Sequence, residues 1–301
     1  MIYIIQGPTA SGKTSLSIEL AKHLNTEILS ADSRQFYKEM NIGTAKPTLE
    51  ELQAVKHHFI NNQTLNKPMN IAAYEKEALP LLNQLLHTKG SVVLAGGSSQ
   101  FIDALIVGLN QVPIYPELQE QLNATLKEQG IKELQERLKT LDFQAYESID
   151  IQNSRRLIRA LEVKLGSGNS ILSFQQQERM PRYSAKRFFI QWDRNDLYNR
   201  INSRVDQMIA DGLEAEVKSL HGYNRATAVD TVGYKEWDLY FSGAASKESV
   251  IEKIKQNTRN YAKRQLTWLN KYAEMIALNP YSKQSLLDQL LTYVNEGNQN
   301  R

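Results

Sequence analysis

Along the first hundred residues, short runs of strand-forming residues alternate with amphipathic segments. The runs lie at 2–6, 27–30, 57–60 and 91–95, and residues 13–24 and 71–86 between them place apolar side chains at helical spacing. Strands that alternate with helices form βαβ units, in which helices cover a parallel sheet. The pattern therefore predicts an α/β fold around a mostly parallel sheet flanked by helices.

Beyond Gly108 this pattern changes. Val112-Pro113-Ile114-Tyr115-Pro116 would break any regular element, and the residues up to about 183 are polar and helical in their periodicity. Strand character returns at 187–192 and 275–278, and helices are expected at 197–211, 232–241, 247–271 and 282–295. We therefore expect a discontinuous core, residues 1–112 and 184–301, with an inserted all-helical domain of residues 113–183.

Composition and charge exclude several classes of protein. The 301 residues carry 36 Lys and Arg against 33 Asp and Glu, and a net charge of +3 argues against binding nucleic acid by bulk charge. There is no cysteine, which excludes disulfides, thiol nucleophiles and cysteine-based zinc sites, and the five histidines show no metal-site spacing. No apolar run approaches the roughly 18 residues that a membrane span needs. We expect a cytoplasmic protein that does not bind membranes.

The first strand is followed by a phosphate-binding motif. Gly7-Pro8-Thr9-Ala10-Ser11-Gly12-Lys13-Thr14 matches G-x-x-x-x-G-K-[ST], between a strand and a helix as the motif requires. Its glycines allow successive N–H groups to turn around phosphate oxygens at a helix N-terminus. Lys13 adds a positive charge, and the Thr14 hydroxyl can bind Mg²⁺. The core is therefore predicted to be P-loop NTPase-like and to bind a di- or triphosphate.

The position of the acidic residues restricts the classes of reaction that the sequence favours. Motor and switch NTPases usually carry a magnesium-binding carboxylate after an apolar strand, but Val92–Ala95 runs into Gly96-Gly97-Ser98-Ser99 without one. Asp32 instead follows the second strand, at the edge of the sheet that faces the phosphate loop. It is a candidate proton acceptor, and the alternative is an N-cap for a following helix.

Several segments together resemble one family, the tRNA dimethylallyltransferases, also called tRNA isopentenyltransferases. The segments are Gly7–Thr14, Ser30-Ala31-Asp32-Ser33 with Gln35 and Tyr37, Asn41–Pro47, Gly96-Gly97-Ser98, Asn153–Glu162, Val232–Glu236 and Tyr261–Leu269. The phosphate loop alone is generic, whereas the Asp-Ser, Ile-Gly-Thr-Ala-Lys-Pro and Lys-Arg-Gln-x-Thr-Trp segments in this order are specific. The resemblance covers nearly the whole chain.

The resemblance implies transfer of a dimethylallyl group from dimethylallyl diphosphate to N6 of the adenosine 3′ of the anticodon, in tRNAs that read U-initial codons. It implies that the loop, Lys13, Arg200 and a Thr14-bound Mg²⁺ stabilise the leaving diphosphate, and that Asp32 accepts the N6 proton. It implies contacts with the tRNA anticodon stem-loop from Asp32, Ser33, Arg34, Gln35, Ser98, Gln119, Gln152, Asn153, Ser154, Arg155 and Arg156. One tRNA would bind one monomer.

Two positions depart from the family pattern, and one role has an ordinary alternative. The usual Gly-Gly-Thr-Gly-Leu-Tyr is here Gly96-Gly97-Ser98-Ser99-Gln100-Phe101, and Gln119 stands where the family often has arginine. Without the resemblance, Arg200 would be read as a solvated residue on an amphipathic helix.

A tRNA ligand also fits the local charge. Basic residues recur between Lys247 and Lys271, with Tyr261 and Trp268 among them, and Arg155, Arg156 and Arg159 form a second patch. The aromatic side chains could equally face the core. A nucleotide-type kinase with a helical lid remains the main alternative function, and a GTPase-like switch or a non-catalytic RNA-binding module is a third.

Overall fold

The chain folds into two compact units. The computed structural model describes residues 1–175, 180–220, 228–272 and 274–299. One unit comprises Met1–Val107 and Pro181–Arg301, and the other Gly108–Met180. The second unit thus begins five residues earlier than the predicted 113, at Gly108, whose φ of 85° is a conformation that favours glycine.

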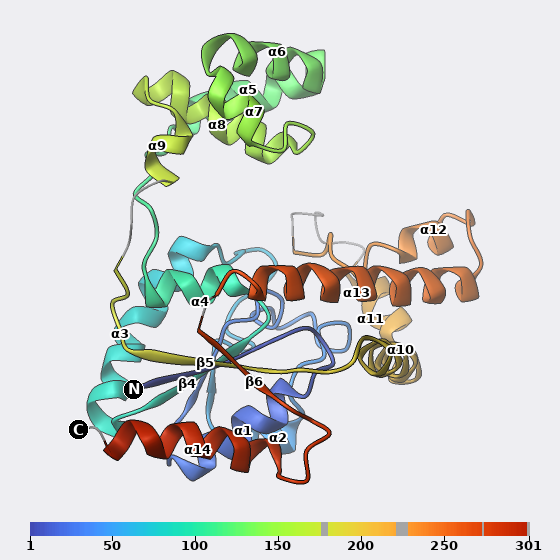
Figure 1. Ribbon diagram of the computed structural model, residues 1–301. Helices are drawn as coiled ribbons and strands as arrows, with labels where there is room; N and C mark the ends of the chain where they lie inside the picture. Colours follow the sequence, from blue (N-terminus) through green and yellow to red (C-terminus); the bar gives the residue numbers. More distant parts are fainter. Residues whose placement is uncertain (176–179, 221–227, 273, 300–301) are drawn as a thin grey trace. The chain divides into compact units, whose positions relative to one another are not determined.

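A six-stranded parallel sheet forms the centre of the first unit (Figure 1). Its strands are β1 (Ile2–Gln6), β2 (Ile28–Ser30), β3 (His57–His58), β4 (Val92–Gly96), β5 (Ala185–Ile190) and β6 (Met275–Leu278). They lie in the order β3-β2-β4-β1-β5-β6, and every pairing is parallel. The predicted P-loop NTPase-like α/β class is confirmed, with a sheet that is parallel throughout.

Helices cover both faces of this sheet. The helices described in the unit are α1 (Lys13–His23), α2 (Leu49–Ala54), α3 (Ile71–Lys89), α4 (Ser99–Ile106), α10 (Arg194–Ala210), α11 (Leu213–Ser219), α12 (Trp237–Phe241), α13 (Lys247–Leu269) and α14 (Leu286–Gln299). Ile2 and Ile4 of β1 pack with α3 and α4, whereas Tyr3 and Ile5 pack with α1 and α14 on the opposite face. Burial of alternate residues on two sides explains the continuous apolar run of this strand.

Several element boundaries differ from the predicted ones for local reasons. β3 is only two residues long, because Phe59 has φ 61° and turns the chain out of the sheet. The helix expected at 232–241 is confined to Trp237–Phe241, because Gly233 has φ 95°. Helices α2, α4 and α11 were not expected, although Thr48 and Glu51 form a capping box at the start of α2.

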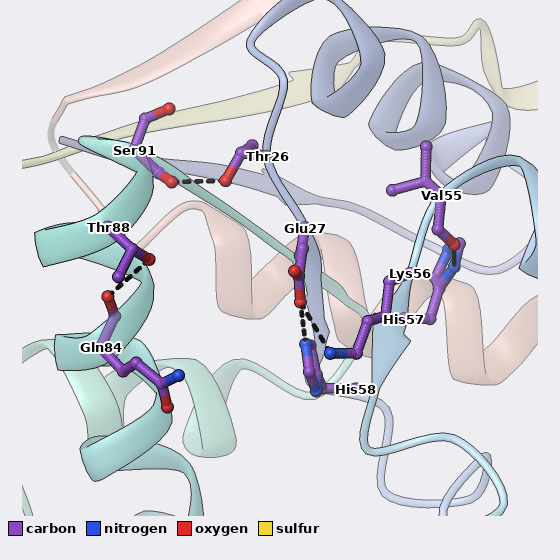
Figure 2. A network of polar contacts seen from close by, with 9 residues as sticks. All are labelled: Thr26, Glu27, Val55, Lys56, His57, His58, Gln84, Thr88 and Ser91. Carbon is purple, nitrogen blue, oxygen red and sulfur yellow. Dashed lines mark hydrogen bonds and ion pairs between the residues drawn. The ribbon is translucent and has the colours of Figure 1, made fainter.

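The edge of the sheet at β3 is held by an ion-pair network (Figure 2). The Glu27 carboxylate contacts His58 Nε2 at 2.5 Å and Lys56 Nζ at 3.4 Å. Burial opposes ionisation of Glu27, but the hydrogen bond from His58 and the charge of Lys56 outweigh it and lower the pKa of that carboxyl. His57 is partly buried, and its Nδ1 lies 2.8 Å from the Val55 carbonyl oxygen of the same segment. The contacts of Glu27 with Lys56 and His58 attach the short β3 to the start of β2.

The second unit is a separate helical bundle. It contains α5 (Pro116–Gln129), α6 (Ile131–Leu141), α7 (Phe143–Ser148), α8 (Ser154–Ser167) and α9 (Ile171–Gln175). Its core is built around Leu134, Leu138 and Leu157. Glu162 is fully buried there, where it accepts a hydrogen bond from the Tyr115 N–H at 2.8 Å and pairs with Arg159 at 2.8 Å. The hydrogen bond from Tyr115 connects the segment before α5 to α8.

None of the helices in the described part of the chain combines the length and the apolar character that crossing a bilayer requires.

Candidate active site

The phosphate loop lies between β1 and α1, as its motif predicts. Gly7 and Gly12 have φ of 147° and 96°, and Ala10 adopts φ 61°. Trp192 Nε1 donates to the Ser11 carbonyl oxygen at 2.8 Å, and Lys13 Nζ donates to the Pro8 carbonyl oxygen at 2.6 Å. The turn is therefore held by one contact within the motif and one from Trp192 outside it, and α1 begins directly after it.

Ser33 and Ser98 meet where β2 and β4 end. The Ser33 N–H donates to Ser98 Oγ at 3.2 Å, and the Ser98 N–H donates to the Ala31 carbonyl oxygen at 3.2 Å. A Cβ on Gly96 would come within 2.2 Å of that Ala31 oxygen, so only glycine allows the two chain segments to lie this close. The two predicted site residues are thus brought together although 65 positions separate Ser33 from Ser98 in the chain.

The alternative that Asp32 caps a helix is wrong. Residues 33–36 form turns, and Asp32 Oδ1 accepts a hydrogen bond from the Arg34 N–H at 3.0 Å, which closes an Asx turn. This bond occupies one carboxylate oxygen and fixes the side chain on the wall of a cavity. The carboxylate is held in place and remains able to accept a proton.

That cavity brings together seven of the predicted site residues. Thr9, Ala10, Lys13 and Thr14 of the phosphate loop lie on one side. On the other side lie Asp32, Arg34 and Gln35. A second cavity on the outer side of the loop shares Ala10, Lys13, Thr14 and Arg204 with the first. We call the first cavity, with Asp32, the crevice.

Two arginines of α10 approach the phosphate loop. Arg200 lies beside the second cavity, where Nε donates to the Ala10 carbonyl oxygen at 2.8 Å and the guanidinium stacks on Trp192 at 4.3 Å. Arg200 is exposed, as the alternative reading expected, but its side chain contacts the phosphate loop. Arg204, one helical turn later, lines both cavities and lies 3.5 Å from Thr9 Oγ1. Arg204 was not predicted, although its i+4 spacing from Arg200 places it on the same helical face.

The crevice is closed by two residues of α13. Gln265 Oε1 accepts from the Thr9 N–H at 3.0 Å, and its Nε2 donates to the Gly97 carbonyl oxygen at 3.1 Å. Tyr261 lies one turn earlier on the crevice wall and is 37% exposed, so it does not face the core. Partial burial and the nearby Asp32 carboxylate raise the pKa of Tyr261 to about 12. Gln265 thus connects the phosphate loop to the end of β4.

The electrostatics of the crevice centre on Lys13. Burial and the neighbouring Arg204 guanidinium lower the pKa of Lys13 to about 8, while Asp32 opposes this shift. Burial also lowers the pKa of Arg204, again against the charge of Asp32. Two buried cations beside one carboxylate make a site with excess positive charge, which an anionic ligand would neutralise.

The donor set around the loop fits a hard cation. The Thr14 hydroxyl lies at the start of α1 and lines both cavities. Across the described residues, no group of three or more histidine, aspartate or glutamate side chains could hold a metal ion. A site with one protein hydroxyl suits Mg²⁺ bound mainly through ligand phosphates and water, and it does not suit zinc.

The predicted tRNA contacts of the second unit lie on its surface. Asn153 caps α8, with Oδ1 accepting from the Arg156 N–H at 3.3 Å, and Gln152, Ser154 and Arg155 are its neighbours in the chain. Arg156 also lies 3.8 Å from Asp150, and Gln119 is exposed on α5. Arg159 differs from the other arginines of the predicted patch, because it is engaged by Glu162 and by the Val112 carbonyl oxygen at 3.0 Å.

The basic stripe on α13 is partly neutralised. Lys247 pairs with Glu214 at 2.5 Å, and Lys255 pairs with Asp206 at 2.8 Å and Glu252 at 3.1 Å. Lys271 lies over the Trp268 ring, 4.3 Å from its centroid. The stripe therefore carries less unbalanced charge than the sequence alone indicates.

The departure at Ser99 and Phe101 has local structural partners. Ser99 Oγ accepts from Gln6 Nε2 at 3.2 Å, a contact that the glycine usual in the family could not make. Phe101 packs against Tyr74 and Phe36, with ring centroids 5.2 and 5.5 Å away. The substituted side chains are thus accommodated in the core below the crevice.

Comparisons with known proteins give one consistent result. A sequence model described as IPP transferase matches residues 35–272. A protein named tRNA dimethylallyltransferase from Christiangramia forsetii is 45% identical over 90% of this chain and 90% of its own length. One from Flavobacterium johnsoniae is 42% identical over 89% of both. These names favour a transferase over a nucleotide kinase.

Comparisons with solved structures give the same family as the comparisons of sequence. The tRNA isopentenylpyrophosphate transferase of Bacillus halodurans has a TM-score of 0.73 and 33% identity, over 98% of this chain and 95% of that one. A eukaryotic dimethylallyltransferase acting on tRNA has a TM-score of 0.83 over 100% of this chain and 80% of its own, and at 23% identity it shows the fold alone.

Proposed function

The chain belongs to the IPP transferase family, and from that membership we propose that it transfers a dimethylallyl group from dimethylallyl diphosphate to tRNA. The acceptor would be N6 of the adenosine 3′ of the anticodon, in tRNAs that read U-initial codons. The single observation that carries the proposal is that a phosphate loop and a fixed carboxylate, Asp32, line the same crevice. Such a crevice offers a site for the leaving diphosphate and a base for the attacking amine.

In the proposed reaction, the lone pair of adenine N6 forms a bond to the allylic carbon as the C–O bond to the diphosphate breaks. The diphosphate leaves with the electron pair of that bond, and the N6 proton passes to the carboxylate of Asp32. N6 is a weak nucleophile because its lone pair is delocalised into the ring, so removal of the proton in the transition state lowers the barrier. The target base would have to leave the anticodon stack to reach Asp32.

The donor would lie at the junction of the two cavities, where Lys13, Thr14 and Arg204 are shared. Loop N–H groups, Lys13 and Arg204 would stabilise the negative charge that grows on the diphosphate, and Arg200 would add its charge from the outer cavity. Mg²⁺ bound by the Thr14 hydroxyl and the diphosphate would neutralise part of this charge.

The acceptor tRNA would be bound by both units. The proposal assigns this role to Ser33, Arg34, Gln35 and Ser98 beside the crevice. In the second unit it assigns Gln119, Gln152, Asn153, Ser154, Arg155 and Arg156. The same proposal includes a monomer that binds one tRNA anticodon stem-loop and works in the cytoplasm, where tRNA is modified.

A labelling assay tests the proposal directly. The protein is incubated with labelled dimethylallyl diphosphate, Mg²⁺ and an unmodified tRNA that has adenosine 3′ of its anticodon. We expect label in this tRNA and none in a matched tRNA with guanosine at that position. Absence of label in the tRNA with adenosine, together with ATP-dependent phosphorylation of a nucleoside monophosphate, would identify a kinase instead.

Donor binding should depend on pH through Lys13. The pKa of this group is about 8 in the ligand-free protein, so its ammonium is mostly charged at pH 7 and mostly neutral at pH 9. If the diphosphate binds the charged form, its Kd rises about tenfold from pH 7 to pH 9, with proton uptake on binding above pH 8. Calorimetry in buffers of different ionisation enthalpy measures the Kd and the number of protons taken up on binding. Lys13→Arg stays charged and should show neither change; an equal rise in this variant would assign the effect to another group.

A further inference from the structure

The loop between β2 and α2 forms one wall of the crevice in a strained conformation. Gly43, Thr44 and Pro47 line the crevice, and Ala45 adopts φ 46°. The left-handed region is unfavourable for a residue with a Cβ, so surrounding contacts must hold Ala45 there. Some of these contacts come from α11, outside the loop, and others from within the loop.

The carboxylate of Glu216 on α11 supplies most of them. Its Oε2 accepts from the Asn41 and Ile42 N–H groups, both at 2.8 Å, and its Oε1 accepts from the Gly43 N–H at 3.0 Å. The Tyr234 hydroxyl donates to Oε1 at 2.7 Å. Four donors on one carboxylate are charge-assisted hydrogen bonds, which are short and strong.

The far end of the loop is anchored separately. Lys46 Nζ donates to the Tyr37 carbonyl oxygen and, at 2.9 Å, to Asn41 Oδ1. A Cβ on Gly43 would come within 2.5 Å of the Tyr234 ring, so this ring packs directly on the loop backbone. Glu216 and Tyr234 therefore hold the part of the loop that precedes Ala45, and Lys46 holds the part that follows it.

Carbonyl oxygens of this loop accept hydrogen bonds from two residues of the proposed site. The Ala45 carbonyl oxygen accepts from Gln35 Nε2 at 3.2 Å and from Arg204 Nη2 at 3.4 Å. Gln35 Nε2 also donates to the Thr44 carbonyl oxygen at 3.2 Å. Gln35 belongs to the proposed acceptor side and Arg204 to the donor side, so the conformation of one peptide affects both.

We propose that Glu216 is a positioning residue of the transfer site, which holds residues 41–45 so that the Ala45 carbonyl group orients Arg204 and Gln35. The inference rests on the proposed function. Glu216 does not line the crevice in which both reactants would bind. It acts only through the loop.

The tests use Glu216→Gln, which keeps the size of the side chain but replaces one acceptor oxygen with a donor. We expect the Kd for inorganic pyrophosphate to rise about fivefold and the single-turnover transfer rate to fall about tenfold. Glu214→Gln is the matched control on the same helix, since Glu214 pairs with Lys247 instead of the loop. It should stay within twofold of wild type in both measurements.

A second change distinguishes positioning from a general loss of stability. Glycine adopts φ 46° without the penalty that alanine has, so Ala45→Gly added to Glu216→Gln should recover about fivefold of the lost rate. Tyr234→Phe removes one donor to Glu216 and should cause a smaller loss in the same direction, which provides a test if Glu216→Gln does not fold.

The outcomes separate this inference from the function itself. Pyrophosphate affinity and transfer rate within twofold of wild type in folded Glu216→Gln, or no recovery in the double variant, would overturn the positioning role. A wild-type protein that labels no tRNA would contradict the proposed function, and pyrophosphate binding would still report on Glu216.

Discussion

Asp32→Asn is expected to lower the single-turnover transfer rate at least 100-fold while tRNA affinity changes less than twofold. Asparagine keeps the Oδ1 that accepts from the Arg34 N–H, so the Asx turn should persist. It cannot accept the N6 proton, and loss of a general base typically costs 10²- to 10⁴-fold in rate. Rapid-quench measurement with labelled donor gives the rate, and filter binding gives the affinity.

Asp211→Asn provides the matched control for this experiment. Asp211 is exposed at the end of α10, where it accepts from Gln207 Nε2 at 2.7 Å, and it does not line the crevice. The control should transfer at the wild-type rate. If Asp32→Asn also transfers at that rate, the role of Asp32 is limited to forming the turn, and another group must take the proton.

Local patterns in the sequence predicted the parts of this structure that depend on neighbouring residues. The phosphate loop is contiguous, and its glycines and helix start need only residues 7–14. The strands β1 and β4 were predictable because burial on both faces leaves continuous apolar runs. Asp32 could be placed at the crevice because parallel strands end at the same edge of a sheet.

Contacts between distant segments could not be predicted in this way. Arg204 reaches Thr9 across 195 positions, and Gln265 reaches it across 256. The spacing of Arg204 from Arg200 and the segment that contains Gln265 are local signals, but they do not predict the contacts with Thr9, because packing of α10 and α13 decides where the side chains point. Arg159 is a similar case. The cluster of basic residues predicted that it would belong to a phosphate-binding patch, but in the folded unit it forms an ion pair with Glu162.

Local strain explains the remaining differences. The expected strand at 57–60 ends early because Phe59 adopts φ 61°, which its aromatic partners Tyr74 and Phe36 accommodate at 4.9 and 6.5 Å. No pattern of apolar residues encodes such a backbone conformation. Tertiary packing selects it, as it does for Ala45 beside the crevice.

Arg204→Gln is expected to lower the transfer rate about 100-fold, because it removes a cation from the position where charge grows on the leaving diphosphate. Arg194→Gln on the same helix should have no effect, since Arg194 is exposed, lies over Tyr198 and lines neither cavity. Arg200→Gln should cost less than Arg204→Gln, because Arg200 lines only the outer cavity.

The pH dependence of donor binding gives a second measurement on the same variant. Arg204 is one cause of the lowered pKa of Lys13, so its removal should raise that pKa toward the ordinary value for lysine. The rise in Kd above pH 8 should then move to higher pH in Arg204→Gln and stay unchanged in Arg194→Gln. A slower transfer rate without this shift would mean that Arg204 lies too far from Lys13 for both to hold the same diphosphate, and the donor would have to be placed elsewhere in the crevice.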